Sequence, residues 1–345
     1  MIGRFLRTLF GRRDPSVLPT RTRRPRPLVA DADFDAPPGA LTAEDIEDRF
    51  FRLVYGFPAA RSSSLSADEQ AVLRHVRDAF GGDRIDIATL PRLPAAVQAL
   101  MGPLHSARTD SLALVRRIEA DPTLADDIVH AVNHSPHVVG GHVRDVSGVL
   151  GRVGYHGLQR VVMQVAMRPV LRRDTGPASR AAGERLWEQA GRSARASAFL
   201  TQPDGDPFEA WLAGLVSQTG VQPVLVELEK WRGLSGVGYS QAFVAAAGLQ
   251  AERIALHAAR QWGLPPRVLQ ALAERADPAD GGLRTPLGRA LLAASRIAML
   301  DVLIEHGLAE PGSVLKATPS QGIGQARLIA CRSQLRTPMA VVAES

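Results

Sequence analysis

The chain of 345 residues contains a single cysteine, Cys331, so it cannot form an internal disulfide. Neither a disulfide framework nor a cysteine-based metal site is therefore expected. Aromatic residues are scarce too, at 5% of the chain, which leaves Leu, Val and Ala to build most of the core. This balance favours helices over a β-sandwich, because strands prefer aromatic and β-branched residues.

Long apolar runs are also absent. The longest apolar stretch, residues 290–304, is interrupted by Arg296 and Asp301. A membrane-spanning helix needs about 18–20 predominantly apolar residues, so none is predicted. The first ten residues carry Arg4 and Arg7 within their apolar run and lack a small-residue cleavage site, which is atypical of a signal peptide. We therefore expect a cytoplasmic protein.

The basic character of the chain belongs to its first 30 residues. The whole chain has a formal net charge of +6. Eight arginines and one aspartate give the first 30 positions a net charge of +7, so the remaining residues sum to −1. A nucleic-acid-binding fold more often carries a basic face on its folded body. We therefore expect no nucleic-acid partner for the body.

The first 13 residues have the spacing of a short amphipathic helix. Apolar residues recur at i, i+3, i+4, i+7 and i+8 from Ile2, and arginines occupy the other positions. Such a helix could lie on an anionic membrane surface, such as the inner membrane, or dock into a groove. It could equally be a disordered terminus, because so short a helix is marginal in water. The residues that would anchor it are Arg4, Phe5, Arg7, Phe10, Arg12 and Arg13.

Helix-start signals recur along the rest of the chain. Thr42 stands three residues before Asp45, Ser66 and Glu69 form a capping box, and Asp121 precedes a proline. No paired strands, hairpin signature or internal repeat is found. The fold class is therefore all-α. Caps and apolar spacing predict helices at residues 42–55, 66–80, 154–167, 186–199, 208–228, 241–248, 251–263, 265–275, 287–305 and 321–335, with a linker at 172–180.

Seven short motifs, in this order, resemble the HDOD domain, a relative of the HD-type metal-dependent phosphohydrolases. The resemblance implies a two-lobed, multi-helix body and a regulatory role. We divide the chain accordingly into a basic tail and Pro-rich linker (1–40), an N-terminal helical extension (41–82), an HDOD-like domain (83–280) and a C-terminal helical extension (281–345). The motifs are LPRLP at 90–94, IEADPTL at 118–124, AVNHS at 131–135, residues 146–161, Trp187, LAGL at 212–215 and WGLPP at 262–266.

The metal ligands of an HD-type phosphohydrolase are replaced in this chain. Such a site needs His and Asp residues that hold divalent metal, which activates water and clamps phosphate. The resemblance puts the His-Asp pair directly after the LAGL motif, where Ser217 and Gln218 stand. Gln189 and Arg275 occupy two further positions where relatives can carry histidine. Amide, hydroxyl and guanidinium groups are poor ligands for a catalytic divalent ion. We predict no catalytic residues, no metal and no cofactor.

One other cluster could hold a metal. His130 and His134 are four residues apart, on one face of a predicted helix. Two histidines at this spacing can share a metal, as in H-E-x-x-H sites. No glutamate follows His130, and the alternative is that both are surface residues at a helix C-terminus, where positive charge is favourable. We favour that second interpretation.

Three functional hypotheses remain at this point. The first is a non-catalytic bacterial signalling protein that binds a partner, such as a response regulator, a kinase or a cyclic-dinucleotide enzyme. This expectation comes from the HDOD resemblance. The second is a phosphohydrolase or phosphodiesterase with a repositioned site. The third is an adaptor that binds a membrane surface or nucleic acid through residues 1–27, whose charge gives a salt-dependent attraction to phosphate.

Overall fold

The described part of the chain is helical throughout. The computed structural model describes residues 37, 39–60, 62–82, 86, 90–93, 97–98, 111–134, 141–172, 177–231, 238–277, 284–318 and 322–336. Apart from an isolated bridge between Leu41 and Leu315, no strand pairing occurs in these residues. The all-α prediction is confirmed. The helices are α2 (Ala43–Tyr55), α3 (Ala67–Ala79), α5 (Ser111–Glu119), α6 (Pro122–Asn133), α7 (Val146–Leu171), α8 (Pro177–Thr201), α9 (Pro207–Val216), α10 (Val221–Lys230), α11 (Gln241–Gln261), α12 (Pro266–Arg275), α13 (Pro286–Glu305) and α14 (Gln325–Arg336).

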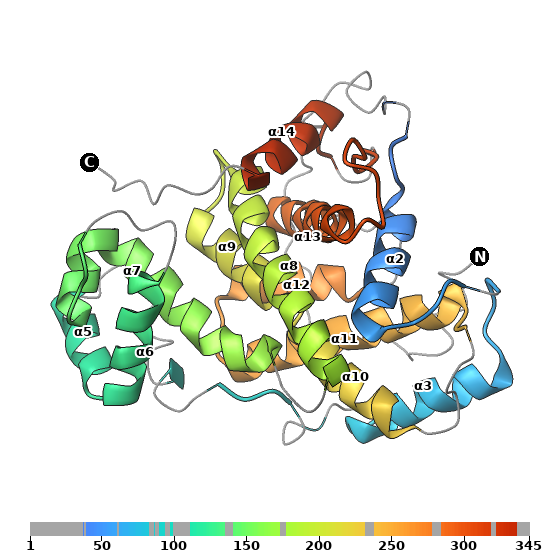
Figure 1. The fold of residues 1–345 in the computed structure, drawn as a ribbon, viewed down its shortest axis with the longest axis horizontal. Coiled ribbons are helices and arrows are strands. Elements are labelled where there is room, and N and C mark those ends of the chain that lie inside the picture. Colours follow the sequence, from blue (N-terminus) through green and yellow to red (C-terminus); the bar gives the residue numbers. More distant parts are fainter. Residues whose placement is uncertain are drawn as a thin grey trace.

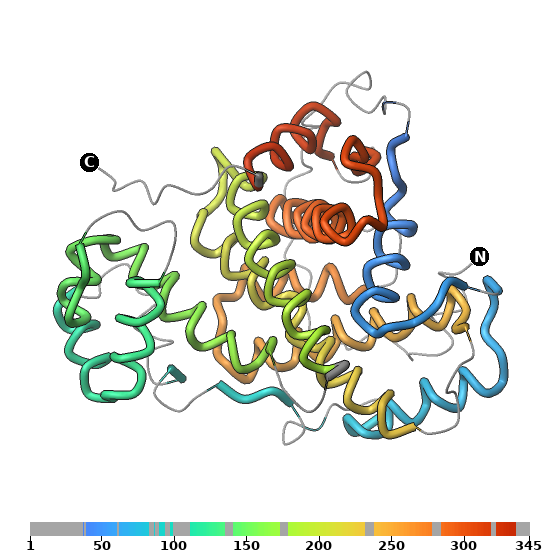
Figure 2. Tube along the Cα trace, viewed as in Figure 1, coloured from blue at the N-terminus to red at the C-terminus, as the bar shows by residue number. Residues whose placement is uncertain are grey.

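The helices form two lobes of unequal size. Helices α5 and α6 pack with the first half of α7 in a small lobe, and the second half of α7 runs into the larger one (Figure 1). In the larger lobe α8 makes its most extensive contacts with α13 and α9. Helix α2 lies beside α13, and α14 crosses the ends of α8 and α13 (Figures 1 and 2). No described helix is long and apolar enough to cross a membrane.

The predicted helix starts are confirmed. The Thr42 hydroxyl accepts a hydrogen bond from the Asp45 backbone N–H at 3.1 Å. Ser66 and Glu69 form a reciprocal capping box, and the Asp121 carboxylate caps α6 through the Leu124 N–H at 3.1 Å. Each cap satisfies a backbone donor that the first helical turn leaves free.

Three boundaries were predicted wrongly. The predicted helix 208–228 is two helices, because the chain turns at residues 217–220. Gly220 lies so close to α11 that a Cβ atom would be 1.9 Å from the Ala251 carbonyl oxygen. In contrast, residues 241–261 form one helix, and α8 begins at Pro177 inside the predicted linker. The spacing of apolar residues along one helix does not predict such contacts between helices.

Helix α7 is broken at one residue between its two halves. Gly154 has φ 69° and ψ −179°, a backbone conformation that is essentially restricted to glycine. The first half of α7 belongs to the small lobe and the second half to the larger lobe. The kink at Gly154 therefore sets the direction in which the small lobe leaves the body.

Replacing Gly154 by alanine should lower the free energy of unfolding by about 1–3 kcal/mol through backbone strain. A Cβ atom at this position would have no neighbour within 4 Å, so steric overlap adds nothing. Gly151→Ala is the matched control, because Gly151 lies on the same helix with the same free space and no positive φ. The control should be neutral or stabilising by up to about 1 kcal/mol. Equal effects of the two changes in urea unfolding would contradict this assignment.

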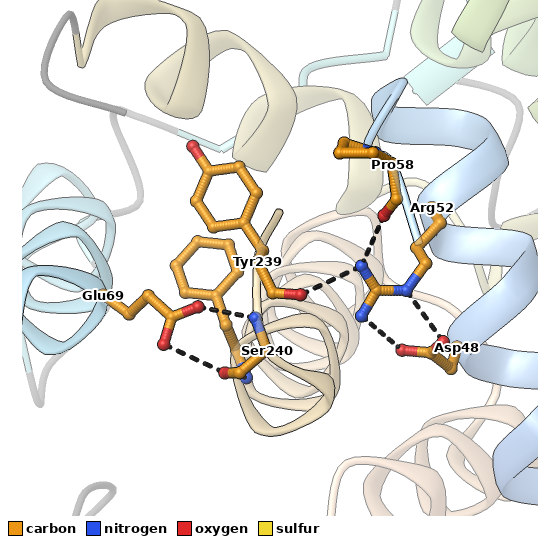
Figure 3. Close-up of polar contacts among 7 residues, drawn as sticks. Asp48, Arg52, Pro58, Glu69, Tyr239 and Ser240 are labelled. Carbon is orange, nitrogen blue, oxygen red and sulfur yellow. Dashed lines mark hydrogen bonds and ion pairs between the residues drawn. The ribbon is translucent and has the colours of Figure 1, made fainter. Parts of the chain in front are cut away.

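The N-terminal extension is joined to the body by two polar residues (Figure 3). The Glu69 carboxylate accepts hydrogen bonds from the Ser240 backbone N–H at 2.6 Å and from the Ser240 hydroxyl at 3.0 Å. It therefore caps α3 and also binds the residue that caps α11. Arg52 forms a two-bond pair with Asp48 and donates to the carbonyl oxygens of Pro58 and Tyr239.

An aromatic cluster lies around this polar junction. Two of the three tyrosines of the chain are in it. The rings of Phe57 and Tyr239 have centroids 4.2 Å apart, and those of Tyr239 and Phe243 are 4.4 Å apart. The scarce aromatic residues are thus concentrated where α2 meets α11. The cluster consists of Phe50, Phe51, Tyr55, Phe57, Tyr239 and Phe243.

Replacing Glu69 by glutamine should lower the free energy of unfolding by about 2–3 kcal/mol, measured by urea denaturation. The amide keeps one acceptor oxygen and turns an N–H group toward backbone donors, which then lose their charge-assisted partner. Asp68→Asn is the matched control, because Asp68 is an exposed acid on the same helical turn. A loss no larger than that of the control would show that Glu69 does not join the two parts.

Candidate functional site

Two of the predicted site residues meet in the middle of the larger lobe. Gln189 on α8 donates to the Ser295 hydroxyl on α13 at 3.1 Å. Gln218, in the turn after α9, donates to the same hydroxyl at 3.4 Å. All three side chains are buried. Residues that are distant in the sequence therefore form one neutral hydrogen-bonded group, which we call the amide cluster.

Ser217 does not point into the amide cluster. Its hydroxyl donates back to the Gly214 carbonyl oxygen at 2.9 Å, and Thr219 does the same to Val216. Both hydroxyls thus bind the end of their own helix, as serine and threonine commonly do. Of the two predicted site residues in this turn, only Gln218 makes a side-chain hydrogen bond to a neighbouring helix.

Arg275 is neutralised by a carboxylate that the sequence did not single out. Its Nε atom lies 2.8 Å from Glu252 on α11, and the pair is almost completely buried. A second ion pair joins Arg296 on α13 to Glu47 on α2 at 2.8 Å. Glu252 therefore balances the positive charge of Arg275.

Burial raises the pKa of Glu252 to about 7. The positive charges of Arg275 and Arg296 lower this pKa, and the negative charge of Glu47 raises it further. Desolvation is the larger effect, since a buried carboxylate loses its hydration. Four helices, α2, α11, α12 and α13, thus contribute one charge each to this group, which we call the charge quartet.

These residues do not fit a catalytic divalent metal. The amide cluster offers only neutral side chains, and Arg275 brings a guanidinium that cannot be deprotonated in proteins. Among the described residues, no group of three or more His, Cys, Asp or Glu side chains is arranged to hold a metal ion. The chemistry that this arrangement supports is hydrogen bonding and ion pairing between helices.

His130 and His134 are exposed at the end of α6. Their rings are stacked with centroids 3.9 Å apart, and His134 Nδ1 lies 2.9 Å from the His130 carbonyl oxygen. They belong to the small lobe, away from the amide cluster (Figure 1). The tail residues Arg4, Phe5, Arg7, Phe10, Arg12 and Arg13 lie outside the described residues.

Two of the quoted motifs have a visible structural role. The Asn133 side chain makes two hydrogen bonds of 2.9 Å with the backbone of Val143, and so joins α6 to the start of α7. Trp262 donates from its indole to the Pro91 carbonyl oxygen at 3.1 Å, which brings the first and last motifs together. Both roles are structural rather than chemical.

Cys331 is not placed for chemistry. Burial raises the pKa of its thiol to about 12, although Arg327 lowers it. A thiol that stays protonated is a weak nucleophile.

The site also contains residues that sequence reasoning missed. Ser295 lies within the long apolar helix predicted at 287–305, and Glu252 lies on α11. The signal that could have identified Ser295 is that it is the one serine in the apolar stretch at residues 290–304. Nothing in the local sequence marks Glu252, because its importance comes from Arg275 on another helix.

The family can be assigned on these grounds. The HDOD domain model matches residues 90–278, which is more than half of the chain. The chain belongs to the HDOD family. A comparison with curated proteins gave no match.

Solved structures show the same fold. A candidate signal transduction protein from Marinobacter aquaeolei VT8 is 22% identical with a TM-score of 0.55, over 78% of this chain and 63% of that protein. The chain thus spans less than two thirds of that relative. An HDOD domain protein of unknown function from Geobacter sulfurreducens is 16% identical with a TM-score of 0.51, over 79% of this chain and 91% of that protein. A candidate metal-dependent phosphohydrolase from Shewanella amazonensis SB2B is 18% identical over 79% of this chain and 100% of that protein, with a lower TM-score of 0.48.

Replacing Glu252 by glutamine should remove a pH-dependent part of the stability. The carboxyl has a pKa of about 7 when folded and about 4.5 when unfolded. The folded state therefore binds the proton more tightly between these values, and wild-type stability is greatest below pH 4.5 and falls as the pH rises to 7. The stability of the wild type relative to the variant should fall by about 2–3 kcal/mol over this range.

The measurement is urea unfolding of both proteins at several pH values from 4.5 to 8. Taking the difference between the two removes the contribution of all other titrating groups. A flat difference for Glu252→Gln would contradict the raised pKa.

Proposed function

We propose that the chain is a non-catalytic regulatory protein of bacterial signalling that acts by binding a partner through its helical body. The observation that carries this proposal is the buried pairing of Arg275 with Glu252. We take Arg275 to stand at a position where HD-type relatives can carry a metal ligand, and Glu252 already balances its permanent positive charge. A divalent cation would be repelled by this guanidinium and would have to displace it from its pair.

The amide cluster supports the same proposal. Gln189, Gln218 and Ser295 use one another as hydrogen-bond partners. Exchanging these bonds for a metal would leave buried amide groups unsatisfied, at a cost of about 1–3 kcal/mol for each group. The residues are therefore suited to hold α8, α9 and α13 together rather than to activate water.

The partner that we propose is a signalling protein, such as a response regulator, a kinase or a cyclic-dinucleotide enzyme. The similar protein from Marinobacter aquaeolei is described as a candidate signal transduction protein. A second proposal concerns residues 1–27, whose positive charge would attract anionic lipid by about 1 kcal/mol per basic residue near the surface. Such an attraction would place the protein at the inner face of the membrane without a spanning helix.

Purified protein should contain less than 0.1 metal ion per chain, and should not hydrolyse bis-p-nitrophenyl phosphate or cyclic dinucleotides with added Mn²⁺ or Mg²⁺. The reason is that the charge quartet and the amide cluster offer no suitable ligand set. Metal analysis by mass spectrometry and a colorimetric assay with and without chelator provide the measurement. Turnover that chelator abolishes, and that Gln218→Ala removes, would overturn the proposal.

The partner itself can be sought by crosslinked capture from the native cell with full-length protein. A variant in which Arg4, Arg7, Arg12 and Arg13 are changed to glutamine is the matched bait. Capture of the same signalling protein by both baits is the result expected if the body is the binding module. Enrichment that is lost with the variant, together with loss of binding to anionic phosphatidylglycerol vesicles, would assign the function to the tail instead.

A further inference from the structure

The small lobe is held together by its own packing and hydrogen bonds. The Asn133 side chain joins α6 to the backbone of Val143, and Arg152 on α7 donates to the Gly141 carbonyl oxygen. These bonds connect both α6 and the first half of α7 to the segment between them. The buried apolar side chains of α5, α6 and the first half of α7 are Leu114, Val115, Ile118, Leu124, Ile128, Val132, Val146 and Val149.

The small lobe is joined to the larger lobe chiefly through α7. Within the described residues, α5 and α6 pack on each other and on α7, and neither packs extensively against a helix of the larger lobe. Figures 1 and 2 show these two helices apart from α8, α9 and α13, with α7 leading from one lobe into the other. On the other side of the small lobe, the chain leaves the larger lobe after Pro91, whose carbonyl oxygen accepts the hydrogen bond from Trp262. Helix α7 is therefore the described helix that both lobes share.

The bend in α7 contains two glycines with different roles. Gly154 has the positive φ and is exposed, and a Cβ atom there would have no neighbour within 4 Å. At Gly157 a Cβ atom would lie 2.6 Å from the Cβ atom of Val153. In a regular helix the Cβ atoms of residues four apart are about 5–6 Å from each other. The bend thus brings Val153 over Gly157, and any side chain at position 157 would force the bend to open.

This bend has the features of a hinge. Glycine adopts positive and negative φ about equally readily, and the open space at Gly154 places no side chain in the way of a change in backbone direction. Hinges in proteins are a few residues that absorb changes in φ and ψ, while the units on either side keep their packing. The small lobe is one such unit. The second half of α7 belongs to the other, because Leu158, Val162 and Met163 are completely buried.

We propose that the bend at Gly154 and Gly157 is a hinge about which the small lobe turns as one body relative to the larger lobe. The contact of Val153 with Gly157 belongs to the closed form of the bend, and opening the bend separates these two residues. A partner that contacts both lobes would bind one arrangement better and shift the population toward it. This last step rests on the proposed function, whereas the hinge is measured on the protein alone, so each can fail without the other.

The test is pulsed electron paramagnetic resonance on full-length protein with two spin labels, in a Cys331→Ser background that removes the natural thiol. Thr123→Cys with Gln270→Cys spans the two lobes, because Thr123 is exposed on α6 and Gln270 is exposed on α12. Gln241→Cys with Gln270→Cys is the matched control, since both of its positions are exposed on the larger lobe. We expect the distance distribution across the lobes to be at least twice as wide as that of the control pair. Equal widths would overturn the proposal.

Gly157→Ala gives a second measurement with the same labels. Its methyl group would overlap Val153, so the bend should open and the mean distance across the lobes should shift, while the control pair keeps its distance. Gly151→Ala should change neither distance, because a Cβ atom there has free space and Gly151 has no positive φ. An unchanged distribution across the lobes in Gly157→Ala, with the control pair intact, would contradict the hinge. If the control pair shifts too, the effect is not confined to the bend, and the widths measured without this substitution decide.

Discussion

The close approach of α8 to α9 and α13 is the constraint on which the rest of the structure depends. At Gly214 a Cβ atom would lie 2.5 Å from the Ser193 carbonyl oxygen and 2.6 Å from the Ala194 backbone, so only glycine allows this contact. Ala290, Ala294 and Ala298 are small residues four positions apart on α13, and all three are buried. Polar groups buried between helices packed this tightly are stabilised when they bind one another.

The amide cluster and the charge quartet follow from this constraint in different ways. Gln189, Gln218 and Ser295 are neutral, so their mutual hydrogen bonds satisfy part of the buried donors and acceptors at little electrostatic cost, and Gln189 Oε1 is left without a hydrogen-bond partner among the described residues. Glu252 and Arg275 are charged and must be paired, because removing either partner would leave a buried charge. The pKa of Glu252 stays raised because the nearby arginine charges offset only part of the effect of desolvation on this carboxyl. Hydrogen bonds and ion pairs between helices thus stabilise the centre of this HDOD fold.

The helices outside the family match, which covers residues 90–278, pack against this centre through specific contacts. Glu47 on α2 and Arg296 on α13 belong to the charge quartet, and Glu69 on α3 binds the start of α11. The aromatic cluster surrounds the same junction. Ile46 and Phe50 of α2 are completely buried. The N-terminal and C-terminal helices therefore complete the core that the family segment alone would leave exposed.

The sequence by itself determined the all-α class, the caps at Thr42, Ser66 and Asp121, and the resemblance to the HDOD family. These features depend on local backbone chemistry and on the order of short motifs, both of which can be read along one chain. Only the tertiary structure decided that Gln189 and Gln218 share Ser295 and that Glu252 neutralises Arg275. It also decided the turn at residues 217–220, because the contact of Gly220 with α11 joins positions more than thirty residues apart. Pairings of this kind depend on distances between helices, and no periodicity within one helix encodes them.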